Sequence, residues 1–191
     1  MTRLLDGRAS RAPAGRASRD GWLAASGLLL LSLIPVLGGA FRLGDLTGGT
    51  VTADNARFFA SPIPVIAHII SSTVFCLLGA FQFLPGLRGR RGWHRVAGFI
   101  LIPAGLVSAL SGLWMAAFST PPDGGSPLLT IIRLAFGSAM AASIVFGILA
   151  IKRRNFVAHG AWMTRAYALG IAAGTQAVVL AIWILSVGPV D

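Results

Sequence analysis

The chain has 191 residues, of which 55% are hydrophobic and 12% are charged, and its formal net charge is +10. A water-soluble domain of this size has too small a core for so many apolar side chains, so the composition indicates a membrane protein. The basic residues lie in short clusters between apolar runs. This distribution argues against nucleic-acid binding and makes the lipid bilayer the expected partner.

The N-terminal segment, residues 1–20, contains five Arg and shows no apolar periodicity. We expect it to be a disordered cytoplasmic tail. The apolar run that follows is too long for the hydrophobic region of a signal peptide and lacks a convincing cleavage site, so it is expected to remain as a helix. Residues 21–191 then form a single transmembrane domain.

Five apolar runs are each long enough to cross a bilayer, which takes about 20 residues of helix. Turns rich in Gly, Pro or charged residues separate them, and helices are expected to end there. The predicted spans are residues 22–42, 62–85, 93–118, 127–151 and 159–187. The predicted fold class is therefore all-α, a polytopic membrane protein with five transmembrane helices.

The positive charges predict how the chain is oriented in the membrane. Twelve of the 16 Lys and Arg residues lie in the tail and in the two basic turns around residues 88–95 and 152–154. By the positive-inside rule, the N-terminus is cytoplasmic and the C-terminus is outside. The chain has no Glu and a single Lys, which is typical of a GC-rich bacterial genome, so the expected location is a bacterial inner membrane.

An internal repeat relates the second and third spans to the fourth and fifth. Span starts, polar residues and basic turns recur at an offset of 65 residues: Ser61 with Ser126, His68 with Arg133, Arg88 with Arg153, and His94 with His159. The repeat predicts two helical hairpins related by an axis along the membrane normal. They would form a four-helix core in which equivalent helices lie diagonally opposite, with the first span peripheral.

Polar residues within the spans are costly and are candidates for function. The set near the cytoplasmic face consists of His94, His159, Gln82 and Arg165. Two histidines at matching depth on diagonal helices are how a helical bundle binds haem b, so His94 and His159 are predicted iron ligands. Arg95 and Arg165 could pair with the haem propionates. The alternative is that both histidines are interfacial residues beside Trp93 and Trp162.

The outer set consists of His68, Arg133, Ser111 and Gln176. A guanidinium has no lone pair for a metal, so Arg133 cannot ligate a second haem. His68 and Arg133, with Gln82 and Gln176 as further polar groups, are predicted to bind an anion, a quinone carbonyl or a carboxylate. The alternative is a structural polar contact across the bundle through Ser111 or Gln176.

Other chemistries find no support in the sequence. No Asp or Glu lies within a predicted span to complete a metallohydrolase site, and neither a Walker-type phosphate loop nor a nucleophile elbow is present. Two functional hypotheses follow. The first is a redox protein that binds haem b or a quinone and works with a redox partner. The second is a non-enzymatic accessory subunit or a small-solute transporter whose buried polar groups are structural or bind an anion.

Three segments carry a family resemblance: Gly79–Phe83 (GAFQF), Arg91–Arg95 (RGWHR) and His159–Leu169 (HGAWMTRAYAL). With His68 and Arg133, they resemble a bacterial membrane-protein family catalogued as domain of unknown function 2306. The resemblance covers roughly residues 60–185 and implies the helical architecture without implying an activity.

A looser similarity is to the ascorbate-reducible dihaem cytochrome b family, whose four-helix core carries paired histidines at two depths. His94 and His159 fit one of those pairs, and His68 fits half of the other. Arg133 departs from that second pair, which argues against electron transfer through two haems.

Overall fold

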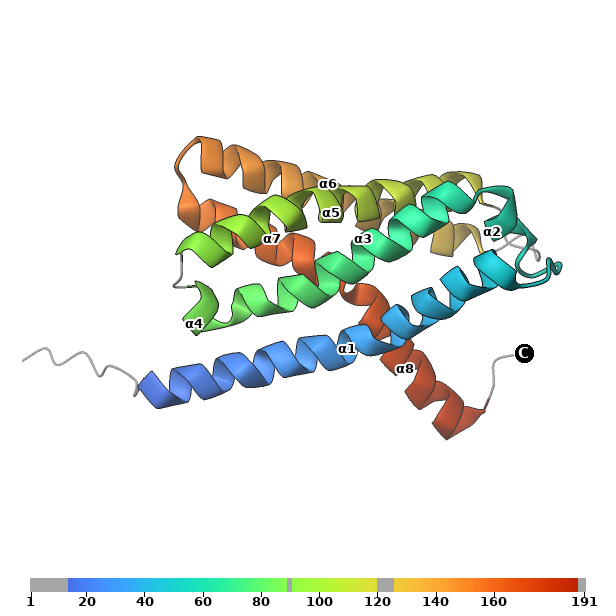
Figure 1. Ribbon diagram of the computed structural model, residues 1–191, viewed down its shortest axis with the longest axis horizontal. Coiled ribbons are helices and arrows are strands. Elements are labelled where there is room, and N and C mark those ends of the chain that lie inside the picture. The colour runs from blue at the N-terminus through green and yellow to red at the C-terminus, as the bar shows by residue number, and fades with distance from the viewer. Residues whose placement is uncertain (1–13, 89–90, 120–125, 189–191) are drawn as a thin grey trace, which may run out of the picture.

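The computed structural model describes residues 14–88, 91–119 and 126–188, which are almost entirely helical and contain no strand (Figure 1). In chain order the elements are α1 (Ala14–Gly48), α2 (Ala56–Ala60), α3 (Pro62–Ala80), the short 3₁₀ helix η1 (Phe81–Phe83), α4 (Pro85–Arg88), α5 (Arg91–Phe118), α6 (Pro127–Lys152), α7 (Phe156–Gly170) and α8 (Ala172–Val187). The expected all-α class is confirmed for these residues.

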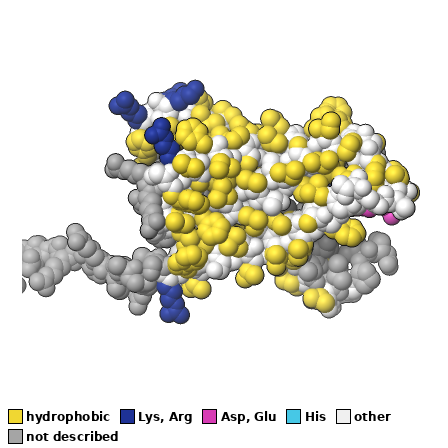
Figure 2. All heavy atoms as spheres, viewed as in Figure 1, with side chains coloured by type: hydrophobic (Ala, Val, Ile, Leu, Met, Phe, Trp, Pro, Cys, Tyr) yellow, Lys and Arg dark blue, Asp and Glu magenta, His cyan; other side chains and the backbone are white. Residues whose placement is uncertain are grey.

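Four helices in the described ranges are long and apolar enough to cross a membrane: Arg19–Gly48, Pro62–Phe83, Gly92–Phe118 and Pro127–Lys152. Figure 2 shows apolar side chains over the middle of the molecule, Lys and Arg at one end and acidic side chains at the other. A broad apolar surface suits hydrocarbon rather than water. We call the end that holds the α6–α7 turn (152–155) the basic end, and the end that holds the α1–α2 connection the polar end.

The first helix is longer at both ends than the predicted span 22–42 and extends to Gly48. Residues 1–13 of the predicted tail lie outside the described residues, but α1 already begins at Ala14. The stretch from Ala14 to Asp20 contains Ala and Arg, which have high helix propensity, so the helix continues past the apolar run. At the other starts, α3 and α6 each begin with Pro after Ser, where the fixed φ of proline suits the first helical turn.

The predicted fifth span is divided into two helices at Ile171. Helix α7 has 15 residues and α8 has 16, so each is roughly 22–24 Å long, less than the hydrocarbon core of about 30 Å. Glycine flanks the break on both sides. A Cβ at Gly170 would lie 2.8 Å from Phe75, and Gly174 contacts the backbone carbonyl of Leu31 on α1. These contacts hold α7 against α3 and turn α8 toward α1 (Figure 1).

Four helices form the core bundle: α3 packs along α5, α5 along α6, and α6 along α7, while α7 also contacts α3. Helix α1 lies outside this bundle, against α3 and α8. The buried side chains at the centre include Phe75, Leu101, Met140, Ile144 and Tyr167. The core bundle thus brings the end of α3 and the starts of α5 and α7 together at the basic end.

Tyr167 fastens α7 to α3. Its hydroxyl donates a hydrogen bond of 2.8 Å to the carbonyl oxygen of Cys76. Its ring lies against Gly79, and its centroid is 5.1 Å from that of Phe83. Because Gly79 has no side chain, α3 and α7 can approach closely at this point.

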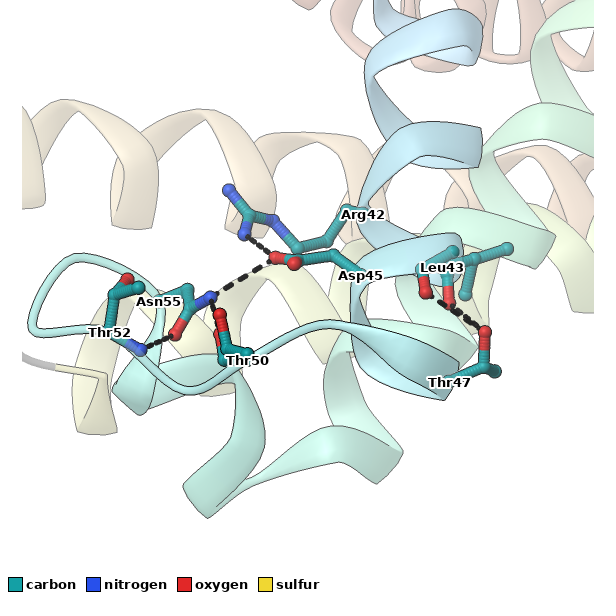
Figure 3. A network of polar contacts seen from close by, with 8 residues as sticks. Arg42, Leu43, Asp45, Thr47, Thr50, Thr52 and Asn55 are labelled. Atoms are coloured by element: carbon teal, nitrogen blue, oxygen red, sulfur yellow. Dashed lines mark hydrogen bonds and ion pairs between the residues drawn. The ribbon is translucent and has the colours of Figure 1, made fainter.

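At the polar end, a hydrogen-bond network shapes the connection between α1 and α2 (Figure 3). Asp45 forms an ion pair of 2.7 Å with Arg42 and also accepts from the Asn55 side chain at 3.3 Å. The buried Asn55 donates to the Thr50 carbonyl oxygen at 2.9 Å and accepts from the Thr52 amide at 2.6 Å. Asn55 therefore ties the loop to Asp45 at the end of α1.

We predict that Gly79→Ala destabilises the protein because the added methyl group would enter the space of the Tyr167 ring. Overpacking of this kind costs about 1–3 kcal/mol. The measurement is thermal unfolding of the purified protein in detergent. Gly38→Ala is the matched control, since a Cβ at Gly38 on α1 meets no atom within 4 Å; it should keep or slightly raise the unfolding temperature. Equal unfolding temperatures for the two variants would contradict the assignment.

Candidate functional site

The two predicted iron ligands lie side by side at the basic end. His94 is in the first turn of α5 and His159 is in the first turn of α7. Their ring centroids are 6.5 Å apart and the ring planes are 79° to each other. His94 is exposed and His159 is half-buried. The structure therefore places these two side chains together, although they are 65 positions apart in the sequence.

Each of these histidines uses Nδ1 for a hydrogen bond to an oxygen atom. His94 Nδ1 lies 2.6 Å from Gln82 Oε1, and His159 Nδ1 lies 3.0 Å from the Gly147 carbonyl oxygen. Amide oxygens only accept hydrogen bonds, so Nδ1 carries the proton in both rings. In the neutral form of each imidazole the lone pair then belongs to Nε2, the nitrogen through which a metal would be bound.

The two hydrogen bonds are related by the offset of the sequence repeat. Gln82 precedes His94 by 12 residues and Gly147 precedes His159 by 12 residues. One hairpin supplies a side-chain amide oxygen and the other supplies a backbone carbonyl oxygen. Gly147 was not among the predicted site residues because a backbone acceptor leaves no residue type to recognise. The repeat could have identified Gly147, because it lies 65 positions after Gln82.

Gln82 also carries an unsatisfied group. Its Nε2 is buried and has no hydrogen-bond partner among the described residues. A buried donor without an acceptor costs roughly 1–3 kcal/mol. The amide at the end of α3 therefore marks a place beside His94 where an acceptor is expected.

The two predicted propionate partners lie on aromatic rings. The Arg95 guanidinium is 5.9 Å from the Phe99 ring centroid, and the Arg165 guanidinium is 4.8 Å from the Trp162 ring centroid. Both arginines are exposed, on the surfaces of α5 and α7 respectively. Arg95 follows His94 directly in α5, whereas Arg165 lies about 120° around α7 from His159, so the prediction that both bind propionates stays a prediction.

The outer set is brought together only in part. His68 Nδ1 lies 2.9 Å from the Ser108 carbonyl oxygen and 3.3 Å from Ser111 Oγ, so His68 faces α5. Arg133 and Gln176 are exposed on α6 and α8. Among the described contacts, none joins either of them to His68. The structure thus places Ser111 with His68, while a ligand shared by His68, Arg133 and Gln176 remains a prediction.

The donor set limits the kind of metal that the site suits. In the described part of the chain, no three residues among His, Cys, Asp and Glu gather to hold an ion. Two imidazoles alone do not complete the coordination of a free ion, which needs at least three or four protein ligands. A porphyrin supplies four ligands itself, so a pair of histidines is enough to complete the coordination of haem iron.

The profile of a protein family described as "Predicted membrane protein (DUF2306)" matches residues 65–191, which include most of α3, all later elements and all the site residues described above. No curated protein and no solved structure gave a significant match.

Proposed function

The chain belongs to the DUF2306 family of predicted membrane proteins, and we propose that it binds haem b between His94 and His159 and transfers electrons at a membrane. The observation that supports the proposal best is the spacing of the two rings. Two imidazoles that share one metal at about 2 Å from each nitrogen have ring centroids roughly 6–6.5 Å apart. The separation between His94 and His159 is 6.5 Å.

The oxygen atoms behind the two rings suit this role. A carbonyl that accepts the Nδ1 proton fixes the orientation of a ligating imidazole and raises the basicity of Nε2. Gln82 and Gly147 are in position to do so. The bound haem would supply a one-electron couple, and the protein would hold both ligands in the required tautomer.

Space and charge beside the pair also support the proposal. Gly98 is one turn after His94, and a Cβ there would meet no atom within 4 Å. A side chain at that position would occupy the room that a porphyrin needs. The unsatisfied Gln82 Nε2 offers a donor to a propionate, and Arg95, next to His94 in the chain, offers a charge-assisted one.

The proposed topology has five membrane crossings. We infer that α7 and α8 together make the fifth crossing as a broken helix, with an N-terminus in the bacterial cytoplasm and a C-terminus outside. The core bundle then consists of two hairpins, α3–α5 and α6–α7, with α1 peripheral. The repeated hydrogen bonds at positions 82 with 94 and 147 with 159 support this arrangement.

We expect full-length protein, purified in detergent after expression with ample haem, to show a sharp Soret band that shifts when dithionite is added. His94→Ala and His159→Ala should abolish this spectrum, because each removes one of two iron ligands. His68→Ala is the matched control and should retain the spectrum, since His68 belongs to the outer set and contacts α5 at Ser108. A featureless wild-type spectrum would contradict the proposal.

We further expect Gln82→Leu to keep the two-histidine spectrum and to raise the reduction potential of the haem. Loss of the Nδ1 acceptor makes the His94 imidazole a weaker donor to ferric iron, so the oxidised form is less stabilised. Haem affinity should fall by about 10–100-fold, the usual effect of losing such a partner. A potentiometric titration measures the first effect. An unchanged potential would show that Gln82 does not act on the iron through His94.

The second candidate is a non-enzymatic function, either transport of a small solute or a role as an accessory subunit. The observation that favours transport is the break at Ile171, because transporters often bind their substrates at discontinuous helices near the middle of the membrane. Uptake into vesicles that survives His94→Ala, together with absence of a haem spectrum, would favour this candidate.

A further inference from the structure

Two hollows lie along the exposed side of α7 and meet at Arg165. The first, of about 660 Å³, lies toward the basic end, and its lining includes Phe156, Gly160, Thr164 and Arg165. The second, of about 500 Å³, lies between α6 and α7, and its lining includes Ala139, Ala142, Trp162, Arg165, Ala168 and Leu169. Both are shallow and open to the outside, and Arg165 lies at the border of the two. We call the two hollows together the Arg165 groove.

Small side chains create the groove. Gly160 on α7 and Ala142 and Ala168 at the α6–α7 contact leave space between larger neighbours such as Trp162. The second hollow is walled mainly by Ala and Leu, so it offers hydrocarbon to whatever lies in it. A hollow of this shape on the lipid-facing side of a spanning bundle suits an extended apolar chain.

The charge in the groove lies where the two hollows meet and is directed toward the basic end. Arg165 is nine residues after Phe156 and therefore about 13 Å along the helix axis. Side chains of a helix point toward its N-terminus, so the Arg165 guanidinium extends back toward the first hollow and the α6–α7 turn. Leu169, in the second hollow, is a turn deeper. The groove is thus basic near the membrane surface and apolar below it.

The Arg165 guanidinium is oriented but not neutralised. It lies on the Trp162 ring, and within the described ranges no carboxylate is within ion-pair distance of it. The nearby turn adds Lys152, Arg153 and Arg154 without an acidic residue. A planar guanidinium that stacks on an aromatic ring still presents N–H groups at its edge, in the geometry that binds phosphate through two hydrogen bonds.

We propose that the Arg165 groove binds one anionic glycerophospholipid, with its phosphate on Arg165 in the first hollow and an acyl chain in the second. A free anion would use the first hollow alone, and a neutral quinone would not use the charge. The headgroup and the chain together match both parts of the groove. This inference does not depend on haem, because it concerns the lipid-facing side of α7.

The test uses native mass spectrometry of the full chain in detergent, with phosphatidylglycerol and phosphatidylcholine of identical acyl chains. Wild-type protein should retain one phosphatidylglycerol in preference to phosphatidylcholine. Arg165→Gln should weaken this binding roughly tenfold, the loss expected for a charge-assisted pair. Ala142→Phe, which fills the second hollow, should weaken binding of the same lipid while leaving Arg165 in place.

Arg95→Gln is the matched control, because Arg95 is also exposed and stacked on an aromatic ring but lines neither hollow. It should bind phosphatidylglycerol as the wild type does. If Arg165→Gln does not fold, Arg165→Lys serves instead and should bind more weakly because it lacks the planar fork. Undiminished binding in the Arg165 variant would overturn the proposal. Equal displacement by inorganic phosphate would assign the site to a free anion, and equal binding of ubiquinone would assign it to a quinone; either would also overturn it.

Discussion

The hydrogen bond that each histidine forms through Nδ1 is the constraint on which the core bundle depends. His68 donates to the Ser108 carbonyl oxygen, His94 to Gln82 and His159 to the Gly147 carbonyl oxygen. Each bond joins two elements of the bundle: α3 with α5, η1 with α5, and α6 with α7. His68 and His159 are half-buried, and a donor that is removed from water and left without an acceptor costs free energy, so these bonds favour the observed packing. The same bonds decide which nitrogen of each ring keeps its lone pair.

The sequence predicted the helices well and their continuity less well. Spans are set by the length of apolar runs and by the breakers between them, and both are visible in the residue order. The break at Ile171 lies within residues 166–187, where no proline and no charged residue marks it. Gly170 and Gly174 are visible in the sequence, but glycine in a membrane helix is compatible with close packing as well as with a break. Only the contacts with Phe75 and Leu31 distinguish the two.

In the candidate site, the sequence predicts how deep each side chain lies but not which neighbouring helix it faces. The rise per residue gives the depth of a side chain, so His94 and His159 could be paired from their positions in the repeat. It does not give the direction in which a helix face points once neighbours are packed. His68 and Arg133 occupy equivalent positions, yet His68 faces α5 and Arg133 is exposed on α6. Tertiary packing decides which way each side chain faces, and this direction cannot be predicted from a single sequence.

The α3–α5 and α6–α7 pairs are alike at the basic end and differ at the polar end. By the offset of 65, Ser111 corresponds to Gln176, and His68 contacts Ser111. The corresponding residues Arg133 and Gln176 lie on α6 and on α8, and α8 turns to α1 after Ile171. The equivalence therefore holds where two histidines meet and is lost where histidine is replaced by arginine. A guanidinium cannot ligate iron. Arg133 would therefore not complete a second haem site even if α8 lay beside it. The proposed haem pair and the Arg165 groove also use different sides of α7, because six residues at 100° each place Arg165 about 120° around the helix from His159. Failure of one proposal therefore leaves the other intact.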